Sequence, residues 1–206
     1  MRRGLNKINS SGSSGFTLVE LLVSMIITLV ILAAGVMVFS SALHTRARQS
    51  SKTDAITSAQ AALDVMSREI GNAGYGLTDN GVVADSTSSV LHIRANTDNS
   101  NATTSDAGED IVFYLDGTGN DQSVVRHDNN LNETSGIINR ISSVSFAYTN
   151  YVNTGVPPVG AGPDTGKISI TLIVKLPDIE GQPSNQTVTV TSDVTLRNST
   201  YMRGQY

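Results

Sequence analysis

An uncharged apolar run near the N-terminus constrains this chain more than any other feature. From Leu21 to Phe39 the sequence reads LLVSMIITLVILAAGVMVF, without a single charged side chain. At about 1.5 Å of rise per residue, a helix of this length nearly crosses the ~30 Å hydrocarbon core of a bilayer. A helix also pairs its own backbone hydrogen-bonding groups, which lipid cannot do. The run therefore predicts a helix that spans a membrane once.

A short basic segment precedes the run. Residues Met1–Gly15 include Arg2, Arg3 and Lys7 and no acidic residue. Basic residues are retained on the cytoplasmic side of a membrane helix, so we expect a cytoplasmic N-terminus and an exported remainder. A cleaved secretory signal is the alternative, but its apolar region usually has only about 7–15 residues.

Glu20 stands at the start of the apolar run, where a carboxylate is costly. A charged side chain at the centre of a membrane helix costs on the order of 2.5–3.5 kcal/mol, and less near an end. Such an acid either reaches the polar interface or has a cationic partner. The run itself contains no lysine or arginine. The nearest cation that processing could create is a new amine at Phe16, four residues away on its own chain, or the same amine on a neighbour.

The residues around Glu20 resemble a processing signal. The sequence Gly15-Phe16-Thr17-Leu18-Val19-Glu20, between a basic leader and an apolar run, resembles the class III signal of type IV pilins and type II secretion pseudopilins. The resemblance implies that a prepilin peptidase cleaves after Gly15 and methylates the amine of Phe16. It also implies that Glu20 aligns each incoming subunit with the terminal amine of a neighbour. Many major pilins have a proline later in the apolar segment, and this segment has none.

The same resemblance implies a location and a set of partners. The protein would lie in the inner membrane with a periplasmic head domain, and later in a pilus or pseudopilus at the cell surface. Its partners would be the prepilin peptidase, other pilins or pseudopilins through the N-terminal helix, the inner-membrane assembly platform, and membrane lipid before assembly.

Past the membrane segment the apolar pattern narrows to one helical stripe. No glycine or proline lies between Leu43 and Ile70, so we expect a single helix from about Phe16 to Ile70, ending in a glycine-rich segment. The stripe predicts that the second half packs on the chain's own sheet, with a two-stranded coiled coil as the alternative. The expected core residues, at intervals of three and four, are Ile56, Ala59, Leu63, Met66 and Ile70.

Alternating apolar and polar residues predict strands in the remainder of the chain. Five such segments lie near residues 91–95, 111–115, 143–148, 168–176 and 187–196. Their polar, threonine-rich faces favour an antiparallel sheet that is wetted on one side. The expected fold class is thus α+β: a long N-terminal helix, membrane-spanning in its first half, packed by its second half on an antiparallel β-sheet.

This interpretation divides the chain into four parts. A cleaved basic leader occupies residues 1–15, and a hydrophobic transmembrane and assembly helix occupies residues 16–42. The amphipathic continuation with its glycine-rich end covers residues 43–76, and an antiparallel sheet head domain covers residues 77–206. Ser67-Arg68-Glu69-Ile70 and the following Ala73-Gly74-Tyr75 resemble PilW-like minor pilins most and J-type type II secretion pseudopilins next.

The sequence offers little to enzymatic chemistry. There is no cysteine, and His44, His92 and His127 lack the spacing of a zinc site. The oxygen-rich segment 116–121 lacks the ligand pattern of a calcium loop, so we expect a turn there. A formal net charge of −4 without a basic block argues against nucleic acid as a partner. We expect no enzyme activity and no cofactor.

The resulting hypothesis is a structural minor pilin that takes part in type IV pilus assembly, in an initiation or tip complex. A type II secretion minor pseudopilin is the first alternative. An adhesin or DNA-uptake pilin is the second, but its binding module would need a basic or aromatic patch, and the arginines of this chain are dispersed among acids.

Overall fold

The computed structural model describes residues 15–99, 103–119, 121–150, 160–178 and 183–205. Of the leader expected at residues 1–15, only Gly15 lies within the described residues. The internal contacts divide the chain into two compact units, Met1–Arg46 and Ala47–Tyr206.

The helix α1 (Leu18–Gly71) is 54 residues long and contributes to both units. By length and composition it is able to cross a membrane, and none of its most apolar window is buried within the protein. Its end lies where the glycine-rich segment predicts it. Gly74 has φ +76°, and a Cβ there would lie 2.6 Å from the Asp79 carbonyl oxygen. Only glycine fits this turn.

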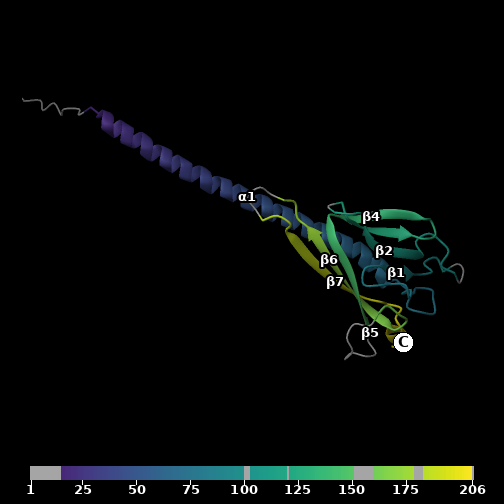
Figure 1. Cartoon of the computed structure of the whole chain (residues 1–206). Helices are drawn as coiled ribbons and strands as arrows, with labels where there is room; N and C mark the ends of the chain where they lie inside the picture. The colour runs from purple at the N-terminus through teal and green to yellow at the C-terminus, as the bar shows by residue number, and fades with distance from the viewer. Residues whose placement is uncertain (1–14, 100–102, 120, 151–159, 179–182, 206) are drawn as a thin grey trace, which may run out of the picture. The chain divides into compact units, whose positions relative to one another are not determined.

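The strands of the second unit form two antiparallel sheets (Figure 1). The first sheet has the order β1-β2-β3-β4, and the second has the order β5-β6-β7, so each is a simple meander. A short helix, α2 (Thr200–Arg203), follows the last strand. The strands are β1 (Leu91–Arg94), β2 (Asp110–Asp116), β3 (Ser123–Asp128), β4 (Glu133–Asn139), β5 (Ile141–Asn150), β6 (Thr165–Lys175) and β7 (Thr187–Thr195).

The α+β fold class is confirmed, but the strands divide between two sheets where the pattern suggested one. The division falls at Arg140, which has φ +60° and separates β4 from β5. A residue in the left-handed conformation changes the direction of the chain. β5 therefore does not pair with β4 in the first sheet and pairs with β6 instead. The separation is not complete, because the Ile141 N–H donates to the Gln122 carbonyl oxygen at 3.0 Å.

One hydrophobic core joins the helix to both sheets. Buried side chains of α1 belong to the same cluster as Phe113 of the first sheet and Ile170 of the second. The segment before β1 links the two sheets as well. Val82 pairs with Ile93 in an isolated bridge, and the Ser88 carbonyl oxygen accepts the Phe146 N–H at 2.9 Å.

Candidate functional site

The first described residues form the junction at which the sequence predicts cleavage. Gly15, Phe16 and Thr17 precede α1 and have no regular secondary structure, and Phe16 is exposed. An added Cβ at Gly15 would meet nothing within 4 Å. The peptide bond between Gly15 and Phe16 is therefore in an accessible, non-helical segment, which is the form of backbone that a peptidase can bind.

Glu20 lies in the first turn of α1 and takes part in the N-terminal cap of this helix. Its carboxylate oxygen Oε2 accepts the Thr17 N–H at 2.9 Å and the Thr17 hydroxyl at 3.0 Å. The Glu20 N–H in turn donates to the Thr17 Oγ1 at 3.2 Å. This reciprocal pair is a capping box, which satisfies backbone N–H groups at the start of a helix that have no partner within it. The Glu20 carboxylate thus lies beside the backbone of the residue that follows the predicted new terminus.

The cap is visible in the sequence as Thr17-x-x-Glu20, although the apolar run drew attention only to the cost of the Glu20 charge in a membrane. The signal that identifies it is the spacing of three residues between a threonine and a glutamate before an apolar run. Thr17 is therefore an additional residue of this site.

Beyond the cap, the first unit presents apolar side chains that are exposed. Those between Leu18 and Phe39 are exposed, Phe39 by 66%. An exposed apolar surface of this extent requires an apolar environment, either lipid or another protein.

Residues 10–36 match the family described as the prokaryotic N-terminal methylation motif. The chain carries the class III signal of type IV pilins and pseudopilins. The class III signal covers the junction, the cap and most of the apolar run, so the recognition made from Gly15 to Glu20 is confirmed. It also supports processing by a prepilin peptidase and a structural role. No curated protein and no solved structure matches the chain.

The structure places four of the five expected core residues on the inner face of α1. Ala59, Leu63, Met66 and Ile70 are buried in the core cluster, and Ala62 joins them. Ile56 is only half-buried. Ala55, one residue earlier, packs against the cluster instead.

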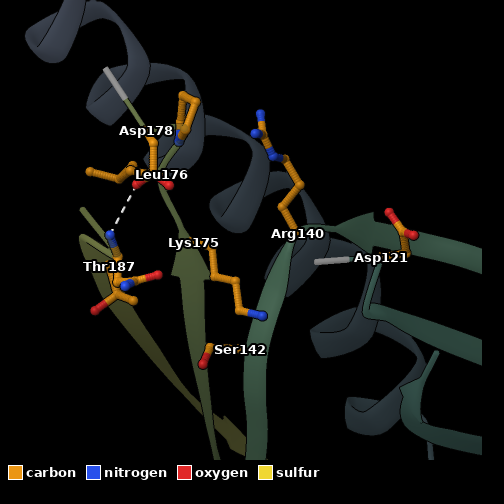
Figure 2. A pocket seen from close by; sticks show the side chains of 9 residues that line it. Asp121, Arg140, Ser142, Lys175, Leu176, Asp178 and Thr187 are labelled. Atoms are coloured by element: carbon orange, nitrogen blue, oxygen red, sulfur yellow. Dashed lines mark hydrogen bonds between the residues drawn. The ribbon is translucent and has the colours of Figure 1, made fainter. Parts of the chain in front are cut away.

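The second unit, Ala47–Tyr206, is called the head unit from here on. It contains a cavity of about 410 Å³ near the ends of β5, β6 and β7. Figure 2 shows Arg140, just before β5, and Lys175, at the end of the neighbouring strand β6, with Asp121 on the turn between β2 and β3. The Lys175 ammonium donates to the Gly119 carbonyl oxygen, so it stabilises the β2–β3 turn. Two cations and two acids line this cavity, and no histidine is among its lining residues.

Two oxygen-rich segments of the head have structural roles. The segment between β2 and β3 contains a turn, in which the Asp121 N–H donates to the Thr118 carbonyl oxygen at 3.2 Å. Carboxylate oxygens of Asp98, Asp106 and Glu109 lie within 4.8 Å of one another, a grouping that the sequence analysis missed. The buried Glu109 carboxylate accepts backbone N–H groups, including that of Thr97 at 2.7 Å, and it thereby fixes the loop.

Proposed function

We propose that this protein is a structural minor pilin, processed by a prepilin peptidase and incorporated into a type IV pilus through its N-terminal helix. The observation that carries the proposal is the class III signal, with an accessible Gly15–Phe16 junction followed by the Thr17–Glu20 cap.

Processing is the first step of the proposed function. The basic leader keeps the junction on the cytoplasmic side, where the peptidase cleaves after Gly15 and methylates the Phe16 amine. The helix remains in the inner membrane, and the second unit folds in the periplasm. The exposed apolar side chains between Leu18 and Phe39 then contact lipid before assembly and other pilins afterwards.

Assembly is the second step, and it uses Glu20. Cleavage creates an amine at Phe16, adjacent to the Thr17 N–H that Glu20 binds in the uncleaved chain. A carboxylate in this position is able to attract the amine of its own chain or that of a neighbouring subunit. The charge of Glu20 is then compensated in the membrane, and the pairing sets the axial register of the incoming subunit.

The N-terminus of the membrane-extracted protein tests the proposal directly. Mass spectrometry is expected to show a chain that begins with a methylated Phe16 in cells with an active prepilin peptidase, and one that begins with Met1 in cells without it. A mature chain that begins near Leu43 would instead indicate an ordinary secretory signal and would contradict the proposal.

A variant at Gly15 makes the test sharper. Gly15→Leu adds a side chain where the structure has open space, so folding is expected to be unaffected. We expect this variant to accumulate in the membrane as unprocessed precursor. Normal cleavage of Gly15→Leu would contradict peptidase recognition at this junction.

Recovery of the wild-type protein in sheared pili distinguishes a minor pilin from a secretion pseudopilin. A pseudopilin would copurify with a secretion apparatus instead.

A further inference from the structure

A histidine in the head unit lies between two carboxylates. The Nδ1 atom of His92, on β1, is 2.9 Å from both carboxylate oxygens of Asp85. Its Nε2 atom is 2.7 Å from the Oδ1 of Asp110, on β2. The side chains of His92 and Asp110 are 8% and 9% exposed, whereas that of Asp85 is 66% exposed. One contact of the ring is therefore buried and the other lies at the surface.

The two contacts require two protons on the ring. A neutral imidazole has one N–H donor and one lone pair, whereas the imidazolium has two donors. If the ring is neutral, one nitrogen directs a lone pair at a carboxylate oxygen, and that contact becomes repulsive. Both contacts are favourable only when His92 carries two protons.

The surroundings determine which contact is lost on deprotonation. Burial by itself would raise the pKa of Asp110, but hydrogen bonds from Asn129, His92 and Arg94 lower it below the ordinary value. Asp110 therefore stays ionised and retains the remaining ring N–H in the interior. Asp85 is the partner that is able to move away, because water can solvate its exposed carboxylate.

Asp85 belongs to a segment that connects the two sheets. The Ser86 hydroxyl binds the backbone of His92, and the Tyr148 hydroxyl of β5 donates to the Thr87 carbonyl oxygen at 2.7 Å. Burial, and to a smaller extent the negative charge of Asp85, raises the pKa of Tyr148 well above the ordinary value, so its phenol stays neutral near pH 7. Asp85 thus lies next to the residues that connect β1 to β5.

We propose that His92 is a proton-dependent clamp, which fastens segment 82–90 between the two sheets when doubly protonated and releases the Asp85 side when it loses a proton. The charged and titratable groups that face the ring or its partners are Asp85, Asp110, Arg94 and Tyr148. The clamp is complete only while both ring nitrogens of His92 carry a proton, because each nitrogen faces a carboxylate.

Amide hydrogen exchange of the full chain in detergent micelles tests the clamp. The informative amides are those of Val83, which donates to the His92 carbonyl oxygen, and Phe146, which donates to that of Ser88. Their protection factors are expected to fall about threefold to tenfold between about pH 5.5 and 8.5, because a charge-assisted contact to a largely exposed carboxylate is lost. Amides of the central strand β6 should keep their protection.

Three variants separate the clamp from a general effect of pH. His92→Gln should abolish the dependence, whereas His127→Gln should preserve it, because the His127 ring is hydrogen-bonded to the neutral Thr134 hydroxyl. Asp85→Asn should reduce protection at pH 5.5 and remove most of the dependence. Constant protection in the wild type, or the same fall in His92→Gln, would overturn the proposal. If His92→Gln does not fold, an unchanged pH dependence in Asp85→Asn overturns it.

Discussion

At the residue scale, Glu20 combines two roles that a single substitution can separate. In the uncleaved chain its carboxylate caps α1, and in the proposed mature protein its charge attracts an amine. Glutamine also functions at the third position of a capping box, so Glu20→Gln retains most of the cap and removes the charge. We expect Glu20→Gln to be processed and inserted normally but to be depleted from sheared filaments, by comparison with wild type at matched membrane levels.

A second variant isolates the cap. Thr17→Val keeps the shape of the side chain but removes the hydroxyl that bonds with Glu20. Loss of a capping side chain costs on the order of 1 kcal/mol, which fraying of one helical turn can absorb, so this variant should enter filaments far better than Glu20→Gln. Equal incorporation of Glu20→Gln and wild type would show that the charge is dispensable for assembly.

Asp110 provides a residue-scale prediction for the head unit. Its folded-state pKa is lowered from the ordinary 3.8, so its contribution to stability is present above that pH and is lost as the pH falls below it. Asp110→Asn is expected to lower the free energy of unfolding by on the order of 1–3 kcal/mol at pH 7. The difference from wild type should shrink below about pH 3.8. Urea unfolding at pH 7 and pH 3 measures it, with exposed Asp64→Asn as the control.

At the scale of elements, the second half of α1 has a buried face and an exposed face, which can be compared at two positions close together in sequence. Leu63 is 4% exposed and lies in the core cluster, whereas Val65 is 46% exposed. Leu63→Ala should lower the free energy of unfolding by about 2–5 kcal/mol, since it leaves a cavity between the helix and the sheets. Val65→Ala should have a much smaller effect. Chemical denaturation compares them, and equal effects would place the stripe against another subunit.

Some elements were predictable from the sequence, and others were not. The period of the stripe predicts α1, and the alternation in segments such as 168–176 predicts the long strand β6, because both patterns are local. β4 has the sequence ETSGIIN, which lacks alternation and contains a glycine, so only its pairing with β3 defines it as a strand. The division into two sheets depends on the left-handed conformation of Arg140, an unusual one for that residue type.

The functional residues also divide into those that a local motif reveals and those that only the fold brings together. The class III signal is a contiguous motif, so the sequence alone was sufficient to recognise it. The clamp at His92 joins residues that are 7 and 18 positions apart in sequence. The pairing of β1 with β2 brings Asp110 to the ring, and the hydrogen bonds of segment 82–90 with the His92 backbone bring Asp85 to it. Separate histidines in a sequence do not indicate which carboxylates they will meet.

At the scale of the whole molecule, the two units require different environments. The first exposes its apolar side chains, whereas the second has its own core, shared by part of α1 and both sheets. A domain with its own core is able to fold alone. We therefore expect residues 47–206, separated from the apolar run, to be soluble and monomeric. Their expression as a fragment should give cooperative thermal unfolding by circular dichroism and a monomer mass of this segment by light scattering.

Metal removal gives the fragment a further test, which bears on the acidic loop. The Glu109 carboxylate already accepts backbone N–H groups from Thr97 and Asp106, so the fold supplies the partners that a cation would otherwise provide. Chelation with EDTA should leave the melting temperature of the fragment unchanged. A fall in melting temperature that calcium reverses would show that the loop containing Glu109 needs an ion. A fragment that unfolds without cooperativity would instead show that the head depends on the apolar half of α1.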